Sequence, residues 1–583
     1  MSASMARHES RIPVAGILLA LLLGTLLLLP TLALADSASS HAAPSQYRGP
    51  SGEVAGGFSS ILDPGVPVGG DAARSPEAWS RWEFWFEHEK DALLRRALDR
   101  AADGSLTQPA PAGVAGLPLS ALRPEDLSGR ALPAIREALR DPSVQVRLAA
   151  ALAAGNARDG ESVPALAEML RGGPVAERRA AALALGFLGD PTALGVLLRA
   201  ADGDQDGETR ALALLALGLL GDPAALPTVR GALSRSLESP GREPRDHRVA
   251  AVTALGLLHD RASLPLLQKV MESRTLGDDR SRAHAATALG RIGDPAAVPV
   301  LLRALREDGD AGVRRSAAAA LGSFPGPGST ADLLASLDGD GDALVRGLSA
   351  VSLARTARSA AVPLLVERTT VRTPRAVRGF AALALGLTGD PAAAPALRAL
   401  LEVRSEDSVR GAAAVALGLL GDRQAGPRLL ETALDTSSSP DLQGYAILGA
   451  ALSGDPGVPA ALASMLREKS QPARTRGAAL AAGVRPFPGS AGLLVRTLLD
   501  ARDPSVRGAA ILGLGLAPDR GVVPLLSDLA HETGGGSPVH RFEAVTALGQ
   551  MALRGALPPV ARLAAGVNYR DLTEDLAAAT RVF

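Results

Sequence analysis

The sequence contains no cysteine among its 583 residues. Disulfide bonds, thiol nucleophiles, thiolate zinc sites, iron–sulfur clusters and a lipid-modified N-terminal cysteine are therefore excluded. A folded protein of this composition has to gain its stability from packing alone.

Aromatic residues and lysine are also scarce. Aromatics make up 3% of the chain, whereas the hydrophobic class makes up 47%, so the core has to be built from Ala, Leu and Val. Small aliphatic side chains favour closely packed helices over sheets, which prefer β-branched and aromatic residues. Lysine occurs only as Lys90, Lys269 and Lys469, so a reaction that depends on a lysine ammonium group is not expected.

The chain has no excess of charge of either sign. Lys and Arg number 61, and Asp and Glu number 61, which gives a formal net charge of zero. The chain therefore lacks the long-range electrostatic field that would attract nucleic acid or an anionic membrane surface. No nucleic-acid partner is predicted.

The N-terminal 35 residues have the pattern of a secretory signal peptide. Arg7 and Arg11 precede an apolar run of 18 residues at 12–29, and Ala33 and Ala35 stand just before Asp36. This pattern predicts cleavage, and the alternative is a membrane tether through residues 12–29. Either way we expect the rest of the chain to be exported, to the periplasm or the extracellular space. Residues 36–74, rich in Gly, Ser and Pro, are predicted to form a disordered linker.

The rest of the chain repeats one unit. Stretches such as VRGAAAVALGLLGD from Val409, VRGFAALALGLTGD from Val377 and TRALALLALGLLGD from Thr209 share a register. Its arginine recurs about every 33 residues, Gln443 takes its place once, and eight residues later comes a small residue, mostly glycine. The twelve arginines are Arg147, Arg178, Arg210, Arg248, Arg282, Arg314, Arg346, Arg378, Arg410, Arg476, Arg507 and Arg541.

Each unit predicts two helices. Capping residues such as Asp206, Asp310 and Asp342 stand four residues before the arginine and predict the start of the Ala/Leu-rich helix. Gly-Asp-Pro turns, for example at 293–295, end it. An amphipathic helix follows, for example at 298–305, with apolar residues three and four apart.

Two helices per unit, with an arginine near the start of the second, resemble the HEAT repeat, and in particular the short bacterial subtype named after phycobilisome lyase subunits. The resemblance covers residues 117–566 and leaves residues 567–583 as a C-terminal tail. It implies an all-α fold, a right-handed α-solenoid of about 13 helix pairs that forms a rod or an arc. It also implies a scaffold for protein partners.

The arginine series has two interpretations. A basic residue at one register of each repeat could form a cationic stripe for an acidic partner. Carboxylates in the adjacent turn, such as Asp310 beside Arg314 or Asp503 beside Arg507, favour instead a structural ladder, in which each arginine pairs with these groups and with carbonyls of the next repeat.

The three tryptophans, Trp79, Trp82 and Trp85, lie close together in the segment 75–116. We expect a helix that caps the open end of the solenoid, and the alternative is a platform for a carbohydrate or a partner. The stretch 82–90 and the tripeptide 568–570 are similar to segments of secreted HEAT-repeat proteins of planctomycete-type bacteria, although Phe86 and His88 depart from that pattern.

Metal and catalytic motifs are weak. Asp202, Asp204 and Asp206 match half of an EF-hand calcium loop, but Ala213 stands where a bidentate Glu is required, so they are a weak calcium candidate. HEAT repeats of deoxyhypusine hydroxylase carry four His-Glu pairs for two irons, whereas this chain has two after the predicted signal peptide, at 88–89 and 531–532, in non-equivalent places.

No catalytic residue and no cofactor is therefore predicted. The leading hypothesis is an exported, non-catalytic scaffold for protein–protein interaction in the cell envelope. Two alternatives remain: a module that binds carbohydrate or an envelope polymer through Trp79, Trp82 and Trp85, and an accessory subunit of a lyase-like or hydroxylase-like enzyme.

Overall fold

The computed structural model describes Trp82 and residues 124–238, 245–273, 279–404, 406–468, 471–516, 519–531 and 538–552. All of them belong to one compact unit, Tyr47–Phe583. Every regular element in these ranges is a helix. Among the described residues, none of the helices combines the length and the apolar character needed to cross a membrane. The predicted signal peptide, the linker and the tail after residue 566 lie outside the described residues.

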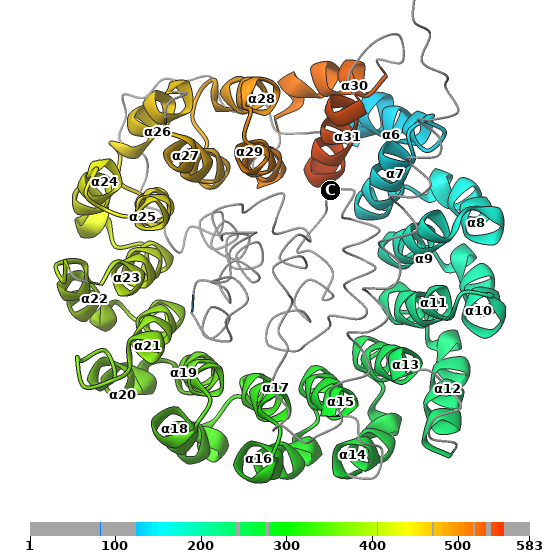
Figure 1. Ribbon diagram of the computed structural model, residues 1–583, viewed down its shortest axis with the longest axis horizontal. Helices are drawn as coiled ribbons and strands as arrows, with labels where there is room; N and C mark the ends of the chain where they lie inside the picture. Colours follow the sequence, from blue (N-terminus) through cyan, green and yellow to red (C-terminus); the bar gives the residue numbers. More distant parts are fainter. Residues whose placement is uncertain are drawn as a thin grey trace, which may run out of the picture. The chain divides into compact units, whose positions relative to one another are not determined.

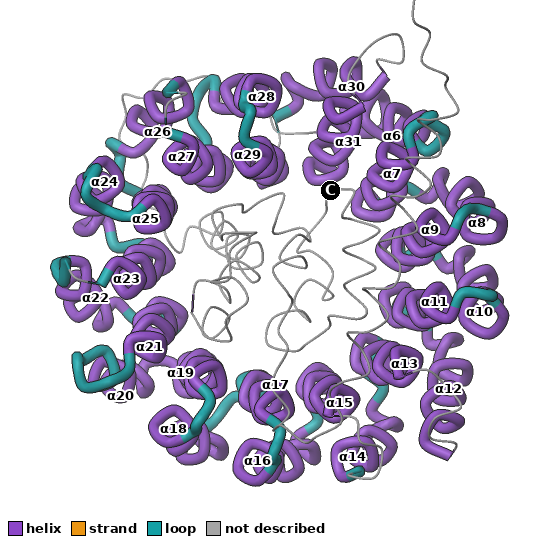
Figure 2. The backbone as a smooth tube through the Cα atoms, viewed as in Figure 1, coloured by secondary structure: helices purple, strands orange, loops and turns teal. Residues whose placement is uncertain are grey.

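The described helices form two concentric series, each with thirteen members, so the predicted all-α solenoid of about thirteen helix pairs is confirmed (Figure 2). A short helix α5 (Pro124–Asp126) and a π-helical turn η2 (Leu127–Ala131) precede them. The outer series consists of α6 (Leu132–Ala138), α8 (Val163–Gly172), α10 (Leu194–Gly203), α12 (Leu226–Glu238), α14 (Leu264–Glu272), α16 (Val298–Glu307), α18 (Thr330–Gly339), α20 (Ala361–Glu367), α22 (Ala394–Leu401), α24 (Gly426–Leu434), α26 (Val458–Arg467), α28 (Ser490–Asp500) and α30 (Val523–His531).

The inner helices carry the Ala/Leu-rich stretches and the repeated arginine. They are α7 (Val144–Ala157), α9 (Val175–Leu188), α11 (Gly207–Leu220), α13 (Arg245–Leu257), α15 (Asp279–Ile292), α17 (Ala311–Leu321), α19 (Ala343–Ala357), α21 (Arg375–Leu387), α23 (Asp407–Leu420), α25 (Pro440–Ser453), α27 (Pro472–Val484), α29 (Pro504–Leu516) and α31 (Pro538–Ala552).

The helix boundaries follow the capping signals of the sequence. The side chains of Asp206, Asp310 and Asp342 accept hydrogen bonds from backbone N–H groups of the first turn, as predicted for N-caps. Between repeats, Gly293 has a φ of 68°, which favours glycine. Asp294 then caps a 3-10 turn by accepting a hydrogen bond from the N–H of Ala296 at 3.0 Å. The chain thus reverses direction within a few residues.

Neighbouring inner helices approach each other closely through the small residue that follows each arginine by eight positions. A Cβ added to Gly186 of α9 would lie 2.8 Å from the Cα of Ala216 of α11, and one at Gly386 of α21 would lie 2.6 Å from the Cα of Ala416 of α23. Since real Cβ atoms do not come so near, glycine at this position sets the short distance between the helices.

The array closes on itself, so the predicted rod or arc is wrong (Figure 1). The last inner helix, α31, packs against the first, α7, and α30 packs against α6. A Cβ at Gly549 would lie 2.7 Å from the Cα of Ala153, the same glycine contact that joins neighbouring repeats. The guanidinium of Arg541 holds both carboxylate oxygens of Asp141, at 2.9 and 3.2 Å, across 400 residues. We call this junction the seam.

The closure of the ring could not be predicted from the sequence, because closure depends on the angle of rotation between successive helix pairs. A rotation of about 28° per pair brings thirteen pairs through a full circle, and a small change in that angle would leave an arc. At the seam, the Nδ1 atom of His531 also lies 2.7 Å from Oε2 of Glu137. Both ends of the array are therefore covered by each other.

The seam can be tested with a double-mutant cycle of Asp141→Ala and Arg541→Ala. The two side chains are 3% and 9% exposed and form an ion pair only if the ring is closed. We expect a coupling energy of about 1–3 kcal/mol, measured as the non-additivity of the unfolding free energies in urea. Asp141→Ala combined with Arg410→Ala is the control, because Arg410 bonds elsewhere in the ring. Additivity of the first pair would contradict closure in solution.

Candidate functional site on the inner helices

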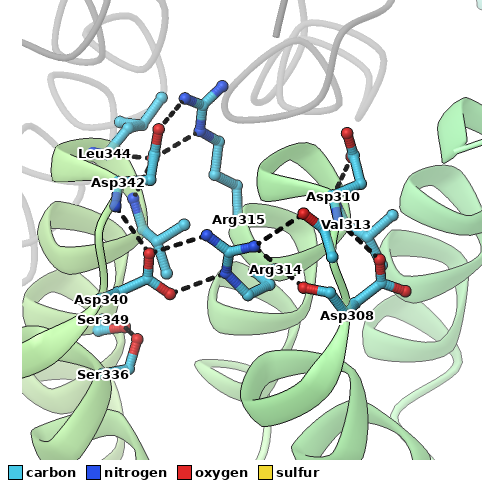
Figure 3. A network of polar contacts seen from close by, with 12 residues as sticks. Asp308, Asp310, Val313, Arg314, Arg315, Ser336, Asp340, Asp342, Leu344 and Ser349 are labelled. Carbon is cyan, nitrogen blue, oxygen red and sulfur yellow. Dashed lines mark hydrogen bonds and ion pairs between the residues drawn. The ribbon is translucent and has the colours of Figure 1, made fainter. Parts of the chain in front are cut away.

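Each repeated arginine lies near the start of an inner helix. Figure 3 shows one of them, Arg314, where it reaches the loops of its own and of the next repeat. Arg314 of α17 donates to both carboxylate oxygens of Asp340, which belongs to the next repeat, at 2.8 and 3.0 Å. It also donates to the carbonyl oxygens of Asp308 at 3.0 Å and Gly309 at 3.3 Å, in the turn before its own helix. One planar side chain therefore ties two repeats together.

The partners differ from the ones suggested by the sequence. The carboxylate of Asp310 accepts a hydrogen bond from the N–H of Val313 at 3.0 Å and so caps α17, while the hydrogen-bonded ion pair of Arg314 is formed with Asp340. Arg507 likewise forms its ion pair with Glu543 of the next repeat. For Arg314 and Arg507 the ion-pair carboxylate therefore comes from the next repeat and the carbonyls come from the arginine's own repeat. Arg410 pairs as expected with a carboxylate of its own repeat, that of Asp407.

The other arginines of the series follow two patterns. Five more pair with a carboxylate of the next repeat, namely Arg147 with Glu177, Arg178 with Asp204, Arg282 with Asp308, Arg378 with Glu406 and, across the seam, Arg541 with Asp141. The remainder bond mainly within their own repeat: Arg210 to the carbonyl of Asp204, Arg248 to Ser236, Arg346 to the carbonyl of Leu337 and Arg410 to that of Leu401. Arg476 lies 3.7 Å from Asp441. These guanidinium groups therefore bond to other groups of the protein and do not form a cationic stripe for a partner.

Two of the three aspartates of the calcium candidate form ion pairs, Asp204 with the ladder arginine Arg178 and Asp206 with its neighbour Arg179. The carboxylate of Asp204 accepts two hydrogen bonds from Arg178. The carboxylate of Asp206 accepts hydrogen bonds from Arg179 and also caps α11 by accepting one from the N–H of Thr209. Asp202 is exposed. Burial alone would raise the pKa of Asp206, but the hydrogen bonds from Arg179 and Thr209 outweigh it and lower the pKa to about 2. In the part of the chain that the structure describes, no group of three or more His, Asp and Glu residues is placed to hold a metal.

Removing one ladder arginine should weaken the fold. Arg314→Ala would leave Asp340, whose side chain is 8% exposed, without its ion-pair partner. We expect a loss of about 3 kcal/mol of unfolding free energy, measured by urea denaturation. Arg303→Ala is the matched control, because Arg303 and its partner Glu272 are 53% and 58% exposed, and its loss should stay below about 1 kcal/mol. Equal effects of the two variants would contradict the structural role.

The Asp206–Arg179 ion pair leads to a prediction about how the stability of the fold depends on pH. A carboxylate with a lowered pKa stabilises the fold above its unfolded pKa of about 4, and that contribution is lost as the pH falls toward 2. The destabilisation caused by Arg179→Ala should therefore be largest near neutral pH and shrink between about pH 4 and pH 2. Urea denaturation at a series of pH values measures it, and an effect that does not change with pH would count against this pair.

A second feature of the inner helices is the site that holds Trp82, which is fully buried. Its indole Nε1–H donates to the carbonyl oxygen of Ser408 at 2.9 Å and lies 3.1 Å from the Oγ atom of the same residue. The ring of Tyr445 is 4.9 Å away, tilted by 54°. A Cβ at Gly379 would overlap the indole, and one at Gly411 would lie 3.2 Å from its Cζ2 atom. We call Gly379, Ser408, Gly411 and Tyr445 the Trp82 site.

This location differs from the predicted one. The Trp82 site belongs to α21, α23 and α25, in the middle of the array, so Trp82 does not cap an open end. The seam, which covers both ends, leaves no end to cap. Because Trp82 is fully buried, it presents no ring face to a sugar. Trp79 and Trp85 lie outside the described residues.

The residues of the Trp82 site were not identified from the sequence, although the sequence contains a signal for them. The residue directly after the ladder arginine is glycine in successive repeats, at Gly347, Gly379 and Gly411. Glycine inside a helix costs about 1 kcal/mol relative to alanine, so its recurrence calls for a packing reason. In this protein the glycines make room for aromatic side chains, since Phe380 fills the space at Gly347 and Trp82 fills the space at Gly379.

Comparisons with known families agree with the repeat geometry. A family model described as HEAT repeats matches residues 119–186, 170–243, 241–322, 330–418 and 493–580. A second one, described as PBS lyase HEAT-like repeat, matches residues 409–435. The chain therefore belongs to the HEAT-repeat family, as the sequence predicted. A search of curated proteins found no match.

Several solved structures resemble parts of the chain. Human deoxyhypusine hydroxylase in complex with glycerol is 25% identical, covers 45% of this chain and 96% of its own, and has a TM-score of 0.22. The complex of CpcE and CpcF of phycocyanin lyase from Nostoc sp. PCC7120 is 22% identical over 48% of this chain and 98% of the other, with a TM-score of 0.29. Kap121p is 13% identical over 89% and 70%, with a TM-score of 0.37.

Proposed function

We propose that this HEAT-repeat protein is an exported, non-catalytic scaffold of the cell envelope and that it binds a protein partner on its inner helices. The observation that carries the proposal is the Trp82 site. There, three successive inner helices hold a side chain from a segment 326 residues away from Ser408. A surface that binds one protein segment in this way suits the binding of another.

The charge distribution supports the same proposal. The repeated arginines bond inside the array, so an acidic partner has no basic stripe to bind there. Apolar side chains are exposed at the start of three inner helices, Val144 of α7, Val175 of α9 and Val539 of α31, and burial of apolar surface is the main favourable term in protein association. Export rests on the N-terminal sequence alone, with its basic start, apolar run and Ala33-Leu34-Ala35 before Asp36.

Site-specific photo-cross-linking in living cells tests the partner. A photoreactive residue replaces Gly444 on the inner helix α25, where an added Cβ meets no atom of the described residues within 4 Å. The matched control replaces Leu434 on the outer helix α24, which is 52% exposed. We expect a discrete cross-linked protein in the envelope fraction from position 444 at five-fold or higher yield than from position 434. Equal yields, or no adduct at either position, would contradict binding on the inner helices.

Export is tested separately on the same cells. We expect the mature chain in the envelope or periplasmic fraction, with Asp36 as its first residue after signal cleavage. N-terminal sequencing of the purified protein measures this. Retention in the cytoplasmic fraction would contradict export, whereas an intact N-terminus in the membrane fraction would indicate the tether at residues 12–29 instead.

A further inference from the structure

The Trp82 site is matched to an indole ring in shape. The positions nearest the ring, Gly379 and Gly411, lack side chains, and an alanine at position 379 would overlap the ring. Both glycines lie inside helices, where glycine weakens the helix relative to alanine. Their presence is explained if the space that they leave is used, and Trp82 fills it completely, with 0% of the residue exposed.

The site is also matched to an indole ring in hydrogen bonding. The Nε1–H of Trp82 reaches the carbonyl oxygen and the hydroxyl oxygen of Ser408. Tryptophan alone combines an aromatic surface of this size with an N–H donor at its edge. Phenylalanine would fill part of the space but leave the oxygens of Ser408 without that donor, so the site discriminates between the two.

The helices that form the site are held together without Trp82. Arg378 of α21 pairs with Glu406, which precedes α23. The glycine contact between Gly386 and Ala416 joins the same two helices, and Gly418 packs against Gly449 of α25. The walls of the site therefore belong to the repeat packing itself, and removal of the indole should leave an empty site rather than an unfolded one.

We propose that Gly379, Ser408, Gly411 and Tyr445 form a binding site specific for the tryptophan side chain of a protein segment. Trp82 occupies the site within its own chain, and a tryptophan-bearing segment of a second protein occupies it when Trp82 is absent or displaced. The inference deepens the proposed function, on which it rests, by naming the chemistry of the segment that the inner helices bind.

Binding of a synthetic peptide to the full chain tests the site. The peptide spans residues 75–101, carries a fluorophore at its C-terminus, and is titrated with the Trp82→Ala protein by fluorescence anisotropy. We expect saturable binding to Trp82→Ala and at least tenfold weaker binding to the wild-type chain, in which Trp82 competes from within the molecule. The same peptide carrying Trp82→Ala should bind the Trp82→Ala protein at least tenfold more weakly than the native peptide does.

Two further variants in the Trp82→Ala protein locate the binding. Gly379→Ala places a methyl group where the indole has to lie and should weaken peptide binding at least tenfold. Gly444→Ala is the matched control, since Gly444 is also a glycine on an inner helix but its added methyl group would lie more than 4 Å from the atoms of the other residues that the structure describes. Peptide affinity should stay within twofold in this control.

Three results would overturn the proposal. The first is equal binding of the native and Trp82→Ala peptides, and the second is equal binding to the Gly379→Ala and Gly444→Ala proteins, because either places the peptide elsewhere. The third is loss of the helical circular dichroism signal in Trp82→Ala, since the site would then not exist without its occupant. The peptide assay needs no cellular partner, so its failure is distinguishable from failure of the cross-linking experiment.

Discussion

The close approach of neighbouring inner helices is the constraint on which the ring depends. Glycine at the shared register lets the backbone of α9 come against Ala216 of α11, and the same contact recurs around the array. Outer helices such as α16, with Leu301 and Leu305, present larger side chains and contact one another much less than the inner helices do. A short spacing on one side and a wider one on the other bends the array toward its inner helices.

Much of the fold could be predicted because each repeat carries its own local signals. The caps at Asp206 and Asp310 and the turn at Gly293 depend only on nearby residues, so the sequence contains them. The closure, the pairing of Arg314 with Asp340 and the position of Trp82 depend on relations between repeats. Small angles accumulate over thirteen pairs, and Gly379 marks a space in the packing without showing that the distant Trp82 fills it.

Charged and small residues have different roles in the array, and this division fits the proposed binding of a partner by a protein of zero net charge. Its ladder arginines and their carboxylates stabilise the junctions between repeats. The proposed binding site depends on side-chain shape, because glycines such as Gly379 create space and Ser408 supplies hydrogen-bond acceptors. Recognition of this kind uses buried apolar area and one directional bond, and depends less on salt than recognition through exposed ion pairs does.

The seam changes how the array can come apart. In an open solenoid the terminal repeats have one neighbour each, and they fray first because only one interface holds them. In the ring every repeat has two neighbours, since α31 takes the place next to α7. Breaking any single junction, the seam included, converts the ring into an arc without freeing a repeat. Local unfolding therefore requires two junctions to fail together, which gives the cysteine-free chain a form of cooperativity that covalent cross-links provide in other proteins.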